Sequence, residues 1–461
     1  MKQVSVLLII SITLVLISCD TTEPPPPPPN GDKPTLQLTL EDVSCIEAWI
    51  KLTTTDLELP ATITLKQYNP TGDSLSQDFL LTTQDSLLYI DSLLPNKNYQ
   101  YQVTSIEHQV SSNELSITTL DTTSHIFSYQ TYEMGEPLTG NSSILYDVAL
   151  IDANNIYAVG EIYMLDSLGQ TDTYGIVHWN GQSWEPIKLY YSIPNVGEFI
   201  LSNIRGILYL SSNEIWFAAG SIFRWDGVSS NAQLIFSRLN LSDPNGSVEK
   251  LWGNSNAYLY GVGNKGTIVI YNGQSWQEVE SGTELALIDI YSKDGNEIYA
   301  AGINVSEVKG VVLKGSGYQF SIMINSEIID ESELFDKLYG DLASVWVDEL
   351  GTVYAGGNLL YRFKNNQWNY VTSLPENFIG GNPGSSYRGA LWSIRGNASN
   401  DYTIAGQRNT LKHFNGVSWE QIGLPYSTSS PVIWYKVEQK GNTAVAVGDN
   451  GSCAFIIMLN K

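Results

Sequence analysis

The feature that most restricts the fold is a short motif ending in glycine that recurs seven times along the chain. Two small or apolar residues precede each of the motif glycines Gly160, Gly220, Gly263, Gly302, Gly357, Gly406 and Gly448. Successive motif glycines are 60, 43, 39, 55, 49 and 42 residues apart. Repeats of about 40 to 50 residues indicate a supersecondary unit that is copied and stacked. We expect the small residues to let neighbouring sheets approach closely.

Residues 251–279 contain one complete unit, in which three or four short strands alternate with tight turns. Its third and fourth strands are joined by Asn-Gly, a pair that supplies the positive φ of a hairpin turn. A tryptophan then opens the fourth strand, and we interpret this residue as structural in its three best copies, Trp184, Trp276 and Trp419. Units of this kind bury their faces only by packing side by side in a ring. The pattern therefore predicts a seven-bladed β-propeller over residues 122–461.

The two ends of this region predict how the ring closes. The seventh unit stops after its third strand, near residues 453–459, whereas a strand-like run at 126–132 precedes the first unit. If that run supplies the missing fourth strand, both ends of the region share one blade and no sheet edge is left open.

The amino-acid composition limits the classes of partner that the chain can bind. The formal net charge is −24, so the phosphates of nucleic acid and of an anionic membrane surface would repel the chain. Charged residues make up 16% of the sequence, while glycine, tyrosine and tryptophan are abundant, which favours an all-β protein.

The N-terminus carries the signals of an anchored protein. Residues 4–17 form an apolar run that is short for a membrane span and typical of a signal peptide. It ends in Leu16-Ile17-Ser18-Cys19, which resembles the lipobox of bacterial lipoproteins. The resemblance implies a signal peptide at 1–18, lipid on Cys19, and a place in the bacterial cell envelope, at the outer membrane or cell surface. Six prolines, 24–29, predict a stiff tether over 19–34.

Residues 35–121 alternate apolar and polar side chains with period two, as strands of a small sandwich do. Within them, Leu94-Pro95 followed by Tyr99 resembles the corner motif of fibronectin type III domains, and Trp49 stands where that family has its core tryptophan. Nearly the whole mature chain thus resembles uncharacterised bacterial lipoproteins that combine such a domain with a kelch- or galactose-oxidase-like propeller. Copper chemistry is not implied, because no matching ligand set is present.

Loop lengths predict the working face of the propeller. Connections between first and second strands and between third and fourth strands are short. Connections between second and third strands, and from one blade to the next, vary in length and lie together at the opposite end of the ring. The long ones are 161–174, 190–202, 241–248, 324–342, 374–389 and 424–432. Variable loops on a rigid scaffold commonly carry function. The candidate ligand-binding residues are Tyr190, Tyr191, Glu198, Asp330, Glu331, Asp336, Tyr339, Asp341, Tyr387, Arg388 and Tyr426.

Aromatic side chains beside carboxylates suit a glycan or an envelope protein as ligand. Residues 330–341 carry oxygen ligands for Ca²⁺ but lack EF-hand spacing, so we expect no metal or other cofactor. Catalytic signatures such as HExxH, GxSxG and CxxC are missing, and His178 and His413 occupy the same repeat position. We therefore expect a binding protein and no enzyme. A propeller-type glycoside hydrolase or lyase acting on extracellular polysaccharide is the alternative, since paired carboxylates can run that chemistry.

Two cysteines remain beside Cys19. Cys45 and Cys453 fall in different predicted domains. We interpret them as two buried thiols, while a disulfide between the domains is the alternative in an oxidising compartment.

Overall fold

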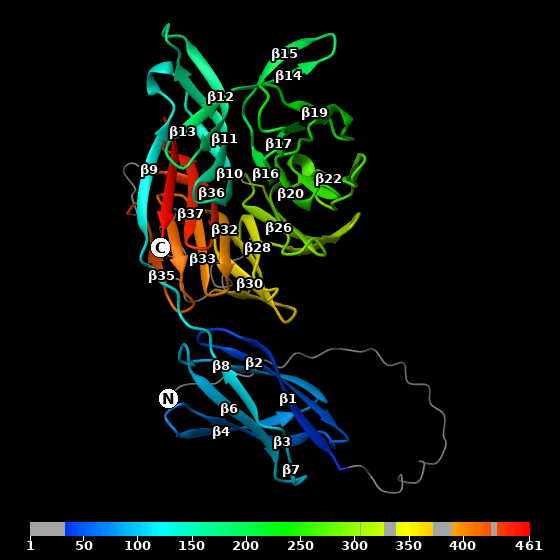
Figure 1. Ribbon diagram of the computed structural model, residues 1–461. Coiled ribbons are helices and arrows are strands. Elements are labelled where there is room, and N and C mark those ends of the chain that lie inside the picture. The colour runs from blue at the N-terminus through cyan, green and yellow to red at the C-terminus, as the bar shows by residue number, and fades with distance from the viewer. Residues whose placement is uncertain (1–32, 305, 327–337, 372–389, 426–430) are drawn as a thin grey trace, which may run out of the picture. The chain divides into compact units, whose positions relative to one another are not determined.

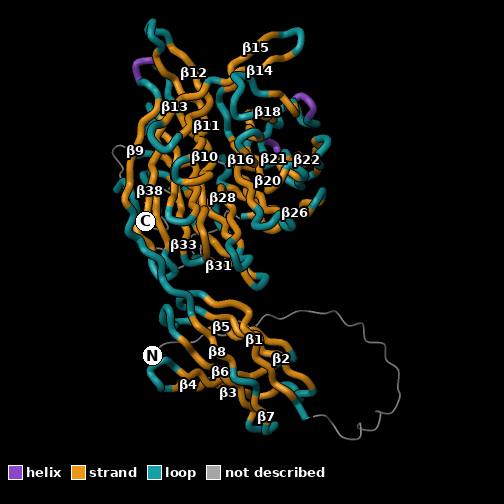
Figure 2. Tube along the Cα trace, viewed as in Figure 1, coloured by secondary structure: helices purple, strands orange, loops and turns teal. Residues whose placement is uncertain are grey.

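The structure, a computed structural model, describes residues 33–304, 306–326, 338–371, 390–425 and 431–461 (Figure 1). The chain divides into two compact units, Met1–Thr123 and Ser124–Lys461. Strands and loops make up nearly all of both (Figure 2), and the helical segments are the short turns η1 (Pro137–Thr139), η2 (Arg238–Asn240) and η3 (Asn264–Gly266). None of the helices in the described ranges has the length and apolarity to cross a bilayer. The prediction of an all-β protein is confirmed.

Unit 1 is a two-layer sandwich. One sheet has the order β1 (Thr35–Val43), β2 (Ala48–Thr55), β5 (Asp85–Ile90). The other has the order β4 (Ser74–Leu81), β3 (Ala61–Tyr68), β6 (Asn98–Ser105), β7 (Val110–Ser111), with β8 (Leu115–Thr118) also paired to β6. Side chains from both sheets, among them Ile50, Ile63 and Val103, form one apolar core.

Trp49 is buried, as a core tryptophan would be, but it does not belong to this apolar core between the sheets. Its neighbours Ala48 and Ile50 on β2 belong to the core, and successive side chains of a strand point to opposite faces. Trp49 is therefore on the other face of the sheet, where it pairs with Tyr89 at a ring-centroid distance of 5.3 Å. The expected corner contact is present, because the backbone N–H of Leu94 donates to the Tyr99 hydroxyl at 2.8 Å.

Unit 2 consists mainly of four-stranded antiparallel sheets, and all of these except the last run in sequence order from the first to the fourth strand. Sheet 1 is β10 (Ile144–Asp152), β11 (Asn155–Leu165), β12 (Thr171–Trp179) and β13 (Trp184–Ile187). Sheet 2 is β16 (Gly206–Ser211), β17 (Glu214–Ala219), β18 (Ser221–Trp225) and β19 (Gln233–Phe236). Sheet 3 is β20 (Lys250–Ser255), β21 (Tyr258–Val262), β22 (Ile268–Tyr271) and β23 (Trp276–Val279).

The second half of unit 2 repeats this pattern. Sheet 4 is β24 (Ala286–Tyr291), β25 (Ile298–Asn304), β26 (Lys309–Ser316) and β27 (Gln319–Asn325). Sheet 5 is β28 (Leu342–Val347), β29 (Val353–Gly357), β30 (Leu360–Lys364) and β31 (Gln367–Tyr370). Sheet 6 is β32 (Leu391–Ala398), β33 (Asp401–Gly406), β34 (Leu411–Phe414) and β35 (Trp419–Gln421). Sheet 7 is β36 (Ile433–Lys440), β37 (Thr443–Asp449), β38 (Ala454–Asn460) and, as its fourth strand, β9 (Ser128–Met134).

The sheets follow one another around an axis. The first strands contact each other in the order β10, β16, β20, β24, β28, β32, β36, and β36 in turn contacts β10. Separate apolar clusters fill the spaces between neighbouring sheets, as between sheets 7 and 1 and between sheets 1 and 2. Unit 2 is therefore a β-propeller in type, as predicted. The predicted pairing of its ends is also present, since β9 lies antiparallel to β38 with Tyr132 opposite Ile456 (Figure 1).

The repeated glycines are required by the backbone of their own sheet. A Cβ atom on Gly160, Gly357 or Gly448 would lie 2.0, 1.7 or 1.8 Å from a backbone carbonyl oxygen at the start of the first strand of the same sheet. The close approach at these glycines is therefore between two strands of one sheet. The expected approach of neighbouring sheets is present at Gly356, the small residue before Gly357, where a Cβ atom would lie 2.7 Å from Ile394 Cδ1 of sheet 6. Gly220 is the exception, with φ 72° and no atom nearer than 3.8 Å to that position.

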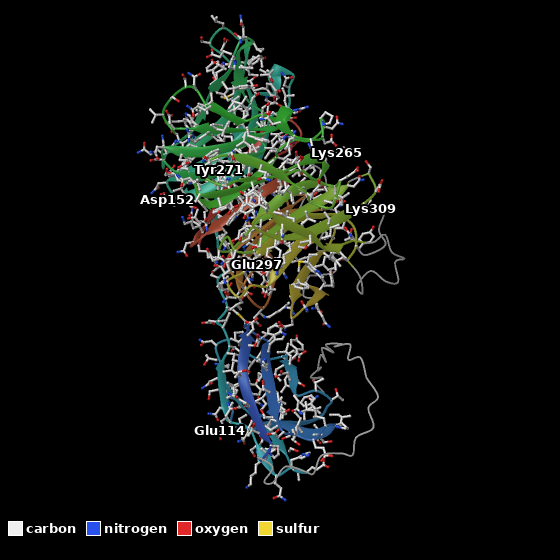
Figure 3. All side chains as sticks on the ribbon, turned by 90° about the vertical axis from the view of Figure 1, so that its right-hand side faces the viewer. Glu114, Asp152, Lys265, Tyr271, Glu297 and Lys309 are labelled. Atoms are coloured by element: carbon white, nitrogen blue, oxygen red, sulfur yellow. The ribbon has the colours of Figure 1, made fainter. Side chains whose placement is uncertain are left out.

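The two ends of the propeller differ as predicted, although two expected loops are strands. Residues 161–174 are the ends of β11 and β12 around a turn that Asp166 closes by accepting from the N–H groups of Leu168 and Gln170. Residues 190–202 contain a hairpin, β14 (Leu189–Ile193) with β15 (Gly197–Leu201). In Figure 3, Lys265, which follows the second strand of sheet 3, and Lys309, which begins the third strand of sheet 4, lie on one side of unit 2. Asp152, which ends the first strand of sheet 1, lies on the other side.

Candidate functional site

A bulge in the first strand sets the geometry of the loop-bearing end. In sheets 1, 4, 5, 6 and 7 the pairing with the second strand skips one residue directly after the residue opposite the motif glycine. In sheets 2 and 3 the residue just before the first strand takes this place: Arg205 N–H donates to the Ala218 carbonyl as Glu249 N–H donates to the Val262 carbonyl. By this register, Ala219 rather than Gly220 stands at the motif-glycine position of sheet 2. A bulge redirects the extra side chain. We call these equivalent positions the mouth ring: Tyr146, Arg205, Glu249, Ile288, Ala343, Trp392 and Tyr435.

Four members of the mouth ring lie next to one another and form a continuous aromatic and cationic surface. The Arg205 guanidinium lies 3.8 Å from the centroid of the Tyr146 ring. The Tyr146 ring is 5.8 Å from that of Tyr435, which is 5.9 Å from that of Trp392. All four side chains are partly exposed. Burial raises the pKa of Tyr435 above its usual value, and Asp449, which accepts from its hydroxyl, adds to this shift. The tyrosine hydroxyls are therefore neutral donors at the mouth.

Directly below the mouth ring, acidic and basic side chains of the first strands meet at the axis. Arg395 of sheet 6 donates to Asp289 of sheet 4 through both terminal nitrogens, at 2.7 and 3.2 Å. Lys436 of sheet 7 lies 3.4 Å from the same carboxylate. Because these sheets are not all neighbours, their side chains must span the centre of the ring. We call this network the plug; it comprises Asp147, Lys250, Asp289, Arg395, Lys436 and Glu438.

The plug also ties sheet 4 to sheet 5, which is bonded in turn to sheet 6. Asp289 accepts from the Ser344 hydroxyl at 2.6 Å and from the N–H of Val345 at 3.1 Å, both in sheet 5. Ser344 in turn accepts from the N–H of Ile394 in sheet 6 at 3.1 Å. Polar atoms that are paired in this way cost little when buried, whereas unpaired ones cost much. The plug is thus a saturated structural element.

The charges of the plug balance one another. Burial alone would raise the pKa of Asp289, but the charges of Arg395 and Lys436 hold that pKa well below its usual value. Burial lowers the pKa of Lys250, and Asp147, 3.1 Å away, offsets part of that shift. Three acidic and three basic side chains therefore compensate one another beneath the mouth.

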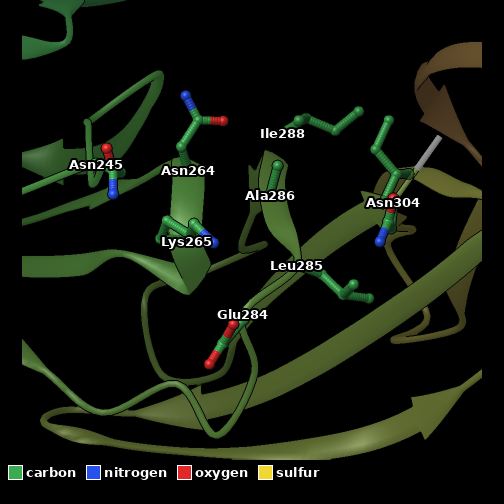
Figure 4. Close-up of a pocket in the computed structure, with 9 residues that line it drawn as sticks. Asn245, Asn264, Lys265, Glu284, Leu285, Ala286, Ile288 and Asn304 are labelled. Carbon is green, nitrogen blue, oxygen red and sulfur yellow. The ribbon is translucent and has the colours of Figure 1, made fainter. Parts of the chain in front are cut away.

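A cavity of about 460 Å³ lies beside the mouth, between sheets 3 and 4 (Figure 4). Its polar lining comprises the amides of Asn245, Asn264 and Asn304 with the charged groups of Lys265 and Glu284. The mouth-ring residue Ile288 belongs to its apolar floor. The wall is fixed by backbone bonds between the sheets, from Gly266 N–H to the Leu285 carbonyl at 3.0 Å and from Leu287 N–H to the Gly263 carbonyl at 2.9 Å.

The structure places five of the residues predicted to bind ligand. Tyr190, Tyr191 and Glu198 lie on the β14–β15 hairpin between sheets 1 and 2, where Tyr191 packs on Phe223 at 4.8 Å. Tyr339 and Asp341 lie in the connection that leads into β28. Both connections are at the loop-bearing end, but they belong to different parts of the ring. Cys19, the predicted lipidation residue, lies outside the described residues, and so do the other candidates: Asp330, Glu331, Asp336, Tyr387, Arg388 and Tyr426.

Two carboxyl groups at this end are unusual acids. Burial raises the pKa of Asp341 to about 6 and also raises that of Asp449. One oxygen of each is buried without a hydrogen-bond partner within the described chain. Across the described ranges, His, Cys, Asp and Glu side chains form no group of three or more that suits a metal ion. The described cysteines, Cys45 and Cys453, are both buried.

Sequence reasoning missed the mouth ring and the plug. The seven mouth positions share no residue type, so no motif marks them, and plug partners such as Asp289 and Lys436 are far apart in the chain. The available signal was positional: each mouth residue precedes its second-strand glycine by a nearly constant distance, 14 residues for Tyr146 and Gly160 and 14 for Ile288 and Gly302.

Comparison with known proteins returns likeness in structure alone. No protein-family model matches the chain, and neither does any curated protein. A solved structure titled "YCF48 bound to D1 peptide" is similar at 15% identity and TM-score 0.49, over 72% of this chain and 97% of that one. The extracellular domains 1–2 of Drosophila Semaphorin 1a are similar at 10% identity and TM-score 0.39, over 71% and 87%. At these values no property of either protein transfers to this chain.

Proposed function

We propose that this chain is a binding protein of the bacterial cell envelope, anchored by lipid on Cys19. In this proposal its mouth ring binds a segment of a protein ligand. The observation that carries the proposal is the contrast between two layers of the first strands. The plug has its charges paired with one another, and Asp147, Asp289, Arg395 and Lys436 are buried, whereas every mouth-ring residue above it except Ala343 is partly exposed. Binding capacity is therefore concentrated at the mouth.

The composition of the mouth favours protein over glycan. Tyrosine, tryptophan and arginine are the residues most enriched at the energetic centres of protein interfaces. A sugar needs an open aromatic face, yet the face of Tyr146 is covered by Arg205 at 3.8 Å. A glycan ligand remains the second outcome of the test below.

The finer architecture belongs to the same proposal. In this proposal unit 1 is a fibronectin type III domain, which the strand orders of its two sheets and the Tyr99 corner support, and it serves as a spacer between the tether and unit 2. Unit 2 is a seven-bladed propeller of kelch type. Replacing Cys19 with Ala and following incorporation of a labelled fatty acid tests the anchor, since lipidation at this residue requires its sulfur.

The binding test compares two arginines that both lie over aromatic rings. Arg205 lies over Tyr146 in the mouth ring, and Arg224 lies 5.8 Å from Trp216 elsewhere in sheet 2. Detergent-solubilised full-length protein should capture an envelope protein whose affinity, measured after its identification, falls in Arg205→Ala and not in Arg224→Ala. Equal affinity of both variants and the wild type would place the ligand elsewhere, and loss of capture after deglycosylation would make the ligand a glycan.

A glycoside hydrolase or lyase is kept as the second candidate because of Asp341 and Asp449. A general acid needs a carboxyl group that stays protonated near neutral pH, and burial raises the pKa of both groups. Assay of polysaccharide cleavage with Asp341→Asn and Asp449→Asn decides between the candidates. We expect no activity in the wild type; activity that either variant abolishes without unfolding would establish the enzyme.

A further inference from the structure

The strap, residues 124–127, precedes β9 and is held on sheets 6 and 7 by a chain of polar side chains. His125 Nδ1 lies 2.9 Å from His413 Nδ1, and His413 Nε2 lies 2.6 Å from Asp401 Oδ1. At the other end, His125 Nε2 lies 3.1 Å from the Ser418 hydroxyl. Phe127 packs edge-on against His413 at a centroid distance of 5.1 Å. Two imidazole rings therefore connect the strap to the propeller.

The proton positions in this chain follow from the carboxylate. Asp401 accepts from His413, Gln439, Asn397 and Lys461, and these bonds hold its pKa well below its usual value although burial opposes them. An ionised carboxylate only accepts, so His413 Nε2 carries a proton. When His413 is neutral, its Nδ1 is a lone pair, and His125 Nδ1 must donate to it.

The same geometry accommodates one added proton but not two. With a single imidazolium, one Nδ1 still donates and the other still accepts, and the remaining nitrogen of His125 donates to Ser418. With both rings protonated, two N–H groups face each other at 2.9 Å, and neither can accept. The contact is then repulsive, and the nearby ammonium group of Lys461 adds to that repulsion.

The groups that face the pair come from several elements. Asp401 lies on β33, Glu420 on β35 opposite His413, Lys461 at the end of β38, and the neutral Gln439 on β36. Burial lowers the pKa of His413, an effect that Asp401 and Glu420 partly offset. Burial also lowers the pKa of His125, and His413 and Lys461 lower it further. Both rings are thus harder to protonate in the closed arrangement than in a solvated one.

We propose that His125 and His413 form a pH-sensitive clasp, which holds the strap on the propeller at neutral pH and releases it in acid. Each histidine has a lower pKa when closed than its ordinary value of 6.5. The clasp is therefore fully closed above pH 6.5 and opens as the pH falls below that value. The pairing of β9 with β38 is not part of the clasp, so release is confined to the strap.

Radical footprinting of Phe127 tests the clasp in the full-length protein. Phe127 should become more reactive between pH 7.5 and pH 5.0, with the open population rising roughly tenfold for each unit by which a histidine pKa is depressed. The variant His125→Gln has no titratable group at this position, so the reactivity of its Phe127 should be the same at both pH values. His178→Gln is the matched control, because His178 occupies the equivalent slot in sheet 1, opposite Glu185 as His413 is opposite Glu420.

Three results would overturn the clasp. The first is equal reactivity of wild-type Phe127 at pH 7.5 and pH 5.0. The second is an unchanged rise of that reactivity in His125→Gln. The third is a shift of both Nδ1 resonances when Zn²⁺ is added at pH 7.5, since this would make the converging nitrogens a metal site.

Discussion

The mouth ring and the plug lie on consecutive residues of the same first strands, yet their surroundings are opposite. Tyr146, at the bulge of β10, is partly exposed and lies under a guanidinium group. The next residue, Asp147, is buried and accepts from Lys250 and from the N–H of Ile207. The comparison indicates that one structural device, the bulge, separates the residues that hold the ring together from those that are available to a ligand.

The largest effect is expected in the plug. Replacing Arg395 with Met leaves the buried carboxylate of Asp289 without its bidentate partner, which should cost about 3 to 5 kcal/mol of unfolding free energy. Chemical denaturation measures this change. Arg224→Met, at an exposed position, is the control and should change stability by less than about 0.5 kcal/mol. A loss below about 1 kcal/mol in Arg395→Met would mean that the plug does not hold the ring.

The mouth should respond in the opposite sense. Arg205→Ala should weaken ligand binding by roughly 10- to 100-fold, as truncation of interface arginines commonly does, while its melting temperature stays near that of the wild type. Titration calorimetry with the identified ligand, beside a thermal scan, separates the two effects. A large fall in stability without a change in affinity would reverse the assignment of the two layers.

The residue that sets the bulge should be intolerant of any side chain. Gly448→Ala places a Cβ atom 1.8 Å from the Ile433 carbonyl oxygen, so we expect a loss of about 1 to 3 kcal/mol, as for overpacked sites. Ala219→Gly, which introduces glycine at the corresponding place in sheet 2, should cost about 1 kcal/mol or less. Equal stability of Gly448→Ala and the wild type would show that the bulge does not require the motif glycine.

Asp341 should make the loop-bearing end sensitive to pH. Its pKa is raised to about 6 by burial, so the ionised form is disfavoured in the folded state and stability declines as the pH rises through the range from 3.8 to about 6. Asp341→Asn should therefore raise the melting temperature at pH 7.5 and leave it nearly unchanged at pH 3.5. A gain of the same size at both values would show that the carboxyl group is not buried as described.

The smallest effect tests the same contrast between saturated and unsaturated polar groups in unit 1. Tyr99→Phe removes the acceptor for the Leu94 N–H and should cost about 1 kcal/mol. Tyr101→Phe removes a buried hydroxyl that has no partner among the described residues, so it should be neutral or stabilising. Urea denaturation of the two variants side by side distinguishes these outcomes, and a larger loss for Tyr101→Phe would contradict them.

The fold could be predicted from local sequence patterns, whereas the site depends on contacts between residues that are far apart in the chain. The glycine motif predicted the second strands because a close backbone approach excludes every other residue, and the unpaired run at 126–132 predicted the closing strand. Trp49 was misplaced because alternation alone does not say which face of a sheet is inward. The plug could not be predicted, since pairs such as Asp289 with Arg395 join residues 106 positions apart. The role of His125 could not be predicted from the sequence, because it depends on the contact with the distant residue His413.

The affinity of Arg205→Ala relative to Arg224→Ala for the same purified ligand tests the central claim most directly. Both variants remove a guanidinium that lies over an aromatic ring in or beside sheet 2, so they differ chiefly in their distance from the mouth. We predict that affinity falls at least about tenfold in Arg205→Ala and stays at the wild-type value in Arg224→Ala. The reverse order, or no loss in either variant, would contradict a ligand site at the mouth ring.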